Sequence, residues 1–178
     1  EWVYQDRIYP INESRISSLC LSFDGTIITF ITHTTLNLYT YQYANGAWTQ
    51  LGTAYTMTTA LATITSTLSM DMSADGLTIA VGCGASNTGI GSTVVLTRSG
   101  SVWTKQGSTL VGTGNTGNSA QGSAVSLSID GNILVVGGSG DNTNVGAIWV
   151  FTRTSSTWSQ LNSKLVGTGN TGASLQGI

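Results

Sequence analysis

Charged side chains are scarce in this chain, where Asp, Glu, Lys and Arg make up 8% of 178 residues, against roughly 25% in ordinary soluble proteins. The basic residues are scattered, at Arg7, Arg15, Arg98, Lys105, Arg153 and Lys164. Nucleic-acid binding needs clustered Lys and Arg to neutralise phosphates, so we expect no nucleic-acid partner. No apolar run reaches the roughly 18 residues of a membrane helix, so we expect no membrane insertion.

Proline and cysteine are also rare, with one and two copies. Cys20 and Cys83 form neither a disulfide framework nor a zinc-binding spacing. We interpret them as small buried residues, with a bridge between them as the alternative. The single histidine, His33, has no evident partners for a triad or a metal site and is expected to face solvent in a loop. The sequence therefore predicts no metal and no cofactor.

The chain is rich in small and uncharged residues, with 40% hydrophobic residues, 50 Ser and Thr together, and 23 Gly. Disordered chains combine low hydrophobicity with high charge, so this one is expected to fold. Polarity without charge, together with abundant Thr, Val and Gly, is typical of antiparallel sheets joined by tight turns.

A repeat of 55 residues organises the sequence. The segment LVGTGNTG occupies residues 110–117 and again 165–172. Other anchors recur with it: Gln121-Gly122 at Gln176-Gly177, Asp75-Gly76 at Asp130-Gly131, and a tryptophan at Trp48, Trp103 and Trp158. A more divergent copy carries Asp24-Gly25. We divide the chain into a remnant of a preceding unit at 1–16, which contains the strand-like Trp2 segment, and repeats at 17–66, 67–122 and 123–177.

Each repeat predicts four short strands. Alternating apolar residues predict the first strand, and Asp-Gly then predicts a two-residue hairpin in which both residues take positive φ. The next strand is almost wholly apolar, as in Ile133 to Val136, which is typical of a strand buried on both faces. Tandem four-stranded antiparallel units without helices indicate blades of a β-propeller; a β-solenoid, with its shorter repeat, is the alternative. Three blades cannot close a ring of roughly four to eight, so we expect an incomplete ring.

The segments SIDGNILVVGG at 128–138 and GAIWVF at 146–151 resemble FG-GAP-like repeats of integrin-α-type propellers, continued here by the strand that opens at Trp158. The resemblance implies a propeller, and such repeats occur in adhesins, secreted proteins and large virus particles. Many of them bind calcium through several Asp residues. Only one Asp per hairpin is present here, and a turn role explains it better than calcium, which takes six to eight oxygen ligands. The WD40 repeat fits neither the period nor the dipeptides.

Few residues are candidates for a functional site. Asp71, on the first strand of its repeat, would face a central channel, although a carboxylate there more often caps a backbone amide. Asp141, Asn142 and Asn144 could bind a sugar or a cation, but they are also ordinary turn formers. The repeated tryptophans could stack on sugars, yet their equal phase favours packing. Asn12 begins a glycosylation sequon, which matters only in a eukaryotic secretory context or on a eukaryotic virus.

Without a converging nucleophile, acid/base pair or metal cluster, the sequence predicts a non-catalytic scaffold or adhesion protein. We expect it outside the cell, on a cell surface or on a virus particle, with protein partners or self-association. A carbohydrate-binding propeller is the alternative, and a polysaccharide-acting enzyme with Asp71 in its channel is a further one. The loop at Asn87 does not match the loop that begins at Asp141, nor does the short loop at His33, which argues against a lectin.

Overall fold

The computed structural model describes residues 15–57 and 68–178 as three successive antiparallel sheets. The first sheet contains β1 (Ile16–Leu21), β2 (Ile27–Thr32), β3 (Asn37–Ala44) and β4 (Ala47–Gln50), with β5 (Tyr55–Thr56) added to β3. The second contains β6 (Ser69–Met72), β7 (Thr78–Cys83), β8 (Ser92–Ser99) and β9 (Val102–Lys105), and the third β10 (Ala124–Leu127), β11 (Ile133–Gly138), β12 (Ala147–Thr154) and β13 (Thr157–Gln160). The segment at Trp2 and the sequon at Asn12 lie outside the described residues.

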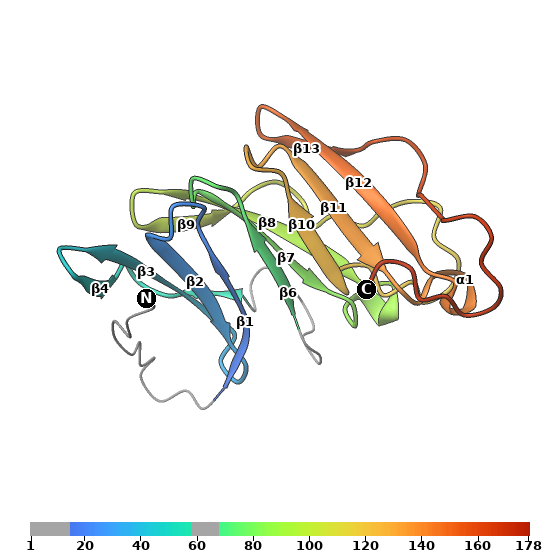
Figure 1. Cartoon of the computed structure of the whole chain (residues 1–178), viewed down its shortest axis with the longest axis horizontal. Helices are drawn as coiled ribbons and strands as arrows, with labels where there is room; N and C mark the ends of the chain where they lie inside the picture. Colours follow the sequence, from blue (N-terminus) through green and yellow to red (C-terminus); the bar gives the residue numbers. More distant parts are fainter. Residues whose placement is uncertain (1–14, 58–67) are drawn as a thin grey trace, which may run out of the picture.

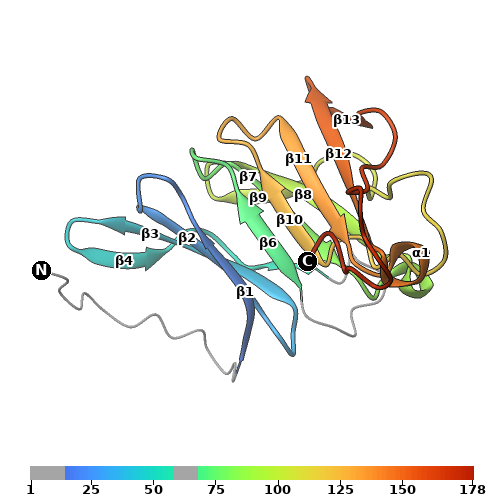
Figure 2. The ribbon, with the colours of Figure 1, turned by 45° about the vertical axis from the view of Figure 1, so that its right-hand side comes forward.

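Within each sheet the strands follow one another in space in the same order as in the chain. The register repeats as well, because Val81 pairs with Val94 in the second sheet and Val136 with Trp149, 55 residues on, in the third. The three sheets lie side by side, with β6 between β1 and β10 (Figures 1 and 2). The first strands of the sheets are therefore neighbours along one side of the molecule.

The Asp-Gly turns are not the predicted two-residue hairpins. In the first sheet Gly25 N donates to Ser22 O at 3.0 Å, and of the Asp24-Gly25 pair only the glycine has positive φ, at 72°. The turn is a longer loop built on a type I turn, followed by glycine in the left-handed region. Asp24 closes it, since its Oδ1 accepts hydrogen bonds from Ser22 Oγ at 2.7 Å and Thr26 N at 3.0 Å. The same arrangement recurs at Ser73, Asp75 and Gly76 and at Ser128, Asp130 and Gly131.

The core consists of two apolar layers, one between each pair of neighbouring sheets. The layer between the first two sheets includes Ile31, Leu38, Met57, Ile79, Val81, Leu96 and Trp103. The layer between the second and third includes Ala80, Val95, Leu134, Val136, Trp149 and Phe151. Strand β7 contributes Ile79 to one layer and Ala80 to the other, and every residue of the strand is buried. An almost wholly apolar strand is therefore required there, because both of its faces are covered.

The loop from β9 to β10 joins the second sheet tightly to the third. The carboxamide of Gln121 forms two hydrogen bonds with one peptide unit, accepting from Gly112 N at 2.5 Å and donating to Gly112 O at 2.9 Å. Trp149 of β12 is fully buried against this loop and donates from Nε1 to Thr113 O at 2.9 Å. A Cβ atom on Gly112 would overlap the indole ring. Glycine is therefore needed there to let the next sheet approach.

Hydrogen bonds also link equivalent positions of neighbouring sheets. Phe23 N donates to Ala74 O at 3.1 Å, and Ala74 N donates to Ile129 O at 2.9 Å. These three residues occupy the same place in the three Asp-Gly turns, so the turns form a ladder of backbone hydrogen bonds. Trp103 of β9 reaches across in a similar way, since its Nε1 donates to Thr40 Oγ1 at 2.8 Å.

Replacing Trp103 with Ala should lower the free energy of unfolding by about 3–5 kcal/mol, because a buried indole leaves the core and Thr40 loses its donor. Trp48 occupies the same repeat position but is half-buried and packs on Tyr43, so its replacement should cost about 1 kcal/mol. Urea denaturation followed by far-UV circular dichroism measures both variants. Equal losses would contradict a core role that is specific to Trp103.

Candidate functional site

Two loops at the same end of the second and third sheets contain left-handed turns. The loop after β7 contains η2 (Asn87–Gly89), with φ of 51° at Asn87 and 54° at Thr88. The loop after β11 contains the turn labelled α1 (Asp141–Asn144), with φ of 48° at Asn142 and 58° at Thr143. A left-handed conformation costs non-glycine residues roughly 1–2 kcal/mol each. Such strain persists only where surrounding contacts enforce it.

The two loops match each other in phase, contrary to the comparison made from sequence. That comparison set Asn87 against Asp141, whereas the strand register places Asn87 opposite Asn142 and Thr88 opposite Thr143, 55 residues apart. Both pairs adopt the same left-handed conformation. The mismatch that argued against a repeated ligand loop was therefore a frame error of one residue.

A groove of about 490 Å³ lies between these two loops, a volume within the usual range for small-molecule sites. It is lined by Gly84, Ala85, Gly89, Asn118, Ala120, Ser123, Ser139, Gly140 and Asn144. None of these side chains is charged, and the side chains of Asn118, Ser139 and Asn144 donate no hydrogen bond to the described residues. The groove therefore offers neutral donors and acceptors between small side chains.

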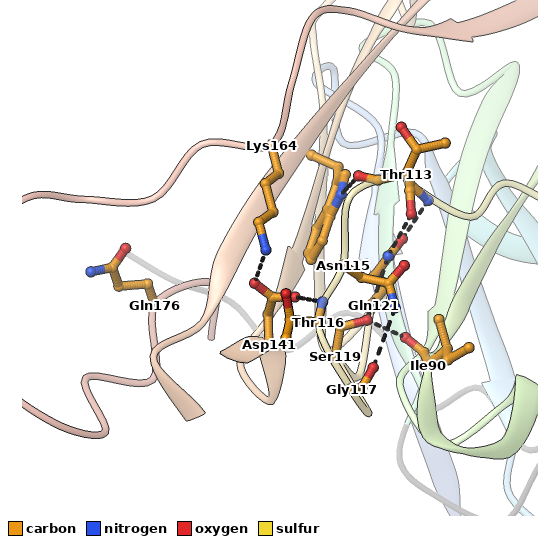
Figure 3. Close-up of polar contacts among 12 residues, drawn as sticks. Ile90, Thr113, Asn115, Thr116, Gly117, Ser119, Gln121, Asp141, Lys164 and Gln176 are labelled. Atoms are coloured by element: carbon orange, nitrogen blue, oxygen red, sulfur yellow. Dashed lines mark hydrogen bonds and ion pairs between the residues drawn. The ribbon is translucent and has the colours of Figure 1, made fainter. Parts of the chain in front are cut away.

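Of the residues predicted for this loop, only Asn144 lines the groove. Asp141 is fully buried and serves the loop itself, since it accepts a hydrogen bond from Thr116 N at 2.7 Å and forms an ion pair with Lys164 (Figure 3). Asn142 is exposed, and its backbone N–H donates to Thr116 O at 3.0 Å. Asp141 thus fixes the segment around Thr116 against α1, with neither of its oxygens left for a ligand.

Asp71 joins two sheets. Its Oδ2 accepts hydrogen bonds from Leu127 N at 2.7 Å and Ser126 Oγ at 3.2 Å on β10, and its Oδ1 accepts from Met72 N at 2.8 Å. Asp71 borders a separate hollow of about 180 Å³, whose other lining residues are Leu21, Phe23, Met72, Ala74, Leu127 and Ile129. The carboxylate therefore caps backbone amides at an otherwise apolar place.

The hairpin carboxylates are exposed but engaged. The hydrogen bond from Ser128 Oγ, followed by those from Asn132, lowers the pKa of Asp130 to about 2. The pKa of Asp24 is lowered in the same way, first by Ser22 and then by Thr26. Within the described residues, no three His, Cys, Asp or Glu side chains come together as a set that could hold a metal ion.

The three equivalent tryptophans pack in different surroundings. Trp103 is buried, while Trp158 is half-buried and donates from Nε1 to Gln106 Oε1 of the preceding sheet at 2.9 Å. Arg98 lies 5.7 Å above the ring of Trp103, and Arg153 lies 5.4 Å above that of Trp158. An arginine over the indole face is a favourable cation–π contact, so the rings that would stack on a sugar are covered by their own sheets.

His33 is exposed and lies 3.3 Å from Ser17 Oγ through Nδ1. Cys20 and Cys83 are both buried, and burial is the main reason that the pKa of Cys20 rises to about 12. None of the helices within the described ranges has both the length and the apolar character needed to cross a membrane.

The sequence contained a signal for the groove that was not used. Asn118, Ala120 and Ser123 line it, but 55 residues later the chain carries Ala173, Leu175 and Ile178. Departures from a strong repeat mark places where one interface differs from the next. Comparing the repeats position by position would have selected Asn118 and Ser123.

The comparisons with known proteins identify the fold. A candidate 6-phosphogluconolactonase from Bacteroides uniformis superposes with a TM-score of 0.56 at 16% identity, covering 83% of this chain and 39% of that one. A similar protein from Bacteroides fragilis gives 0.55 at 15%, with 84% and 38% covered, and a protein of unknown function from Desulfotomaculum acetoxidans gives 0.56 at 14%, with 89% and 44% covered. The three sheets are blades of a β-propeller. The chain spans about two fifths of the length of these structures, and no curated protein matches it.

The family resemblance drawn from the sequence was wrong. Residues 122–165 match the Kelch motif, a β-propeller repeat, and no FG-GAP repeat is found. The segments 128–138 and 146–151, which suggested FG-GAP-like repeats, both lie inside this match. They consist of an Asp-Gly turn, a buried apolar strand and a Gly-rich loop. These features meet the packing needs of a four-stranded blade in general, so they do not distinguish one repeat family from another.

The pKa of Asp130 falls on folding, so its stabilising contribution is complete above the ordinary carboxyl value of 3.8 and is lost as the pH falls towards about 2. We expect the unfolding temperature to drop across this window, and to drop less steeply in Asp130→Asn, which keeps a turn-forming side chain. Calorimetry between pH 2 and 5 would show this. Identical slopes for the variant and the wild type would refute the role of Asp130.

The second blade carries Ser86 and Thr109 at the positions of Asp141 and Lys164, which permits a matched test. Asp141→Ser should lower the free energy of unfolding by about 2–3 kcal/mol, because Lys164, with only 19% of its side chain exposed, loses its partner. Adding Lys164→Thr should recover part of this loss, with a coupling of about 1–3 kcal/mol in a double-mutant cycle. Strictly additive losses by urea denaturation would show that the pair does not act together.

Proposed function

We propose that this chain forms part of a non-catalytic propeller scaffold that presents the loops containing η2 and α1 to a protein partner. One observation carries the proposal: each carboxylate in residues 15–57 and 68–178 accepts a hydrogen bond from a backbone amide. These carboxylates are Asp24, Asp71, Asp75, Asp130 and Asp141. General acid–base catalysis needs a carboxyl group that reaches the substrate, whereas these groups hold turns and loops together.

The composition supports a place outside the cytosol, on a cell surface, in a secreted fraction or on a particle. With charged residues at 8% of the chain, the exposed surface is formed largely by Ser, Thr, Gly and Asn side chains. The loops at the η2 and α1 end are held rigidly, as Ala120 N donates to Gly89 O at 3.0 Å and Gln121 N to Ile90 O at 2.7 Å. Rigid loops reduce the entropy that is lost on binding a partner.

A carbohydrate ligand is the second candidate. The observation in its favour is the uncharged groove, where the side chains of Asn118, Ser139 and Asn144 have no hydrogen-bonding partner among the described residues. Matching left-handed turns at Asn87 and Asn142 also give the two neighbouring loops the same form. The groove lacks an aromatic platform, since no Trp, Tyr or Phe lines it. We therefore place it second.

Two similar structures are described as candidate 6-phosphogluconolactonases, and this name implies a phosphorylated substrate. Phosphate is usually held by Arg, Lys or helix N-termini. The groove is lined by neither Lys nor Arg, and at about 15% identity the similarity concerns the fold. We do not extend lactonase activity to this chain.

The proposal is tested on the native protein and on the purified chain. Surface biotinylation and fractionation should place the native protein in the surface, secreted or particle fraction, in a complex with another protein. The purified chain should release no product from 6-phosphogluconolactone or from soluble polysaccharides, and Asp71→Asn should behave like the wild type. A lone cytosolic monomer would refute the scaffold, and product release abolished by Asp71→Asn would establish an enzyme.

Immobilised neutral glycans separate the two binding candidates. The scaffold proposal expects no retention of the purified chain. Retention that is lost in Asn118→Ala and Asn144→Ala, but kept in Asn115→Ala on the neighbouring loop, would favour the carbohydrate site.

A further inference from the structure

The face of the third blade that points away from the second is apolar and uncovered. Val135, Ile148 and Val150 on this face are half-buried, and Ile133 is 45% exposed. At the equivalent positions of the second blade, Thr78, Ala80, Thr93 and Val95 are all buried beneath the third blade. A hollow of about 160 Å³ also opens on this face, bordered by Val135, Ile148 and Ile178. The third blade thus repeats a surface that the second blade uses for packing.

The loop that follows the third blade repeats the loop that receives Trp149. Gln176 Oε1 accepts a hydrogen bond from Gly167 N at 2.6 Å, as Gln121 does from Gly112. Leu165 pairs with Ile148, as Leu110 pairs with Thr93. At Gly167, however, a Cβ atom would meet only the end of the Gln176 side chain. The place that the indole fills on Gly112 is formed again here and is open.

The next peptide unit is also prepared for a partner. In the second blade, Thr113 O accepts from Trp149 Nε1 at 2.9 Å, and Thr113 N donates to Gln160 Oε1 at 2.7 Å. Thr168 is the equivalent residue after the third blade, and neither its N–H nor its carbonyl has a partner among the described residues. A matching sheet would supply an indole donor for the carbonyl and a carboxamide acceptor for the N–H.

The ladder of turns ends in the same direction. Phe23 N and Ala74 N both find a carbonyl in the turn of the following blade. Ile129 N, the next donor in the series, has no acceptor among the described residues, and the Ile129 side chain is 76% exposed. The face therefore presents an apolar surface, an indole-sized recess and unpaired backbone groups in one register.

We propose that this face binds a further four-stranded sheet of the same repeat class, with a tryptophan at the position of Trp149 and a glutamine at that of Gln160. The interface would continue the packing between the second and third blades. It is separate from the groove and goes beyond the proposed scaffold role, because it specifies the chemistry of a partner. A second copy of this chain fits less well, since its first sheet carries Tyr39 in place of the tryptophan, stacked on Phe30 with 5.6 Å between ring centroids.

The test adds such a sheet. A second copy of residues 124–178 is appended directly after Ile178, which continues the 55-residue period. The extended protein should unfold cooperatively, at a temperature at least about 4 °C above that of the chain as it stands, since roughly 2–4 °C corresponds to 1 kcal/mol at this size. Trp149→Ala in the appended copy alone should abolish the rise, whereas Thr154→Ala on its exposed hairpin should keep it.

Gly167→Leu provides the matched test on the receiving face. In the unextended chain it should leave the unfolding temperature unchanged, and in the extended protein it should remove the gain. No rise in the extended protein, with or without folding of the appended copy by circular dichroism, overturns the proposal. Dimers of the unextended chain in sedimentation that Gly167→Leu dissociates would also overturn it, because the occupant would then be a second copy.

Discussion

The seating of Trp149 on Gly112 shows the constraint on which the whole structure depends: a sheet that is apolar on both faces must be covered on both. A buried tryptophan removes a large apolar area from water, and its position here requires that the opposing loop has no side chain. The Gln121 carboxamide holds that glycine in place, and the indole N–H is satisfied by Thr113 O. Covering one blade with the next thus combines apolar burial with complete hydrogen bonding of the buried polar groups.

The scarcity of charge has a structural counterpart. Asp71 bridges two blades through backbone amides, Asp141 holds the loop at Thr116, and the hairpin carboxylates close their own turns. A protein with few acidic groups, all of them used for local order in its described part, has little left for acid–base chemistry. This allocation supports a binding or scaffolding role more strongly than composition does.

Symmetry and departures from symmetry carry different information in a repeat protein. Residues present in every blade, such as the hairpin Asp, serve packing and turns, because each blade faces the same folding problem. Differences such as Asn118 against Ala173 create features that exist at one interface only. The groove is such a feature. A binding site on this fold is therefore better sought among the exceptions than among the repeated motifs.

The all-β blade architecture followed from the sequence, since the period, the strand alternation and the turn residues all reflect local conformational preferences that repeat along the chain. The repeat family did not follow, because the residues that suggested it meet general needs of a blade. The roles of Asp141, Asp71 and Gln121 also stayed hidden, as their partners Lys164, Leu127 and Gly112 come close only when the chain folds back or a neighbouring blade packs. Sequence determined which segments become strands and turns. Tertiary structure decided which polar side chains are buried in service of the fold and which remain open to a partner, because that choice depends on contacts between residues far apart in the chain.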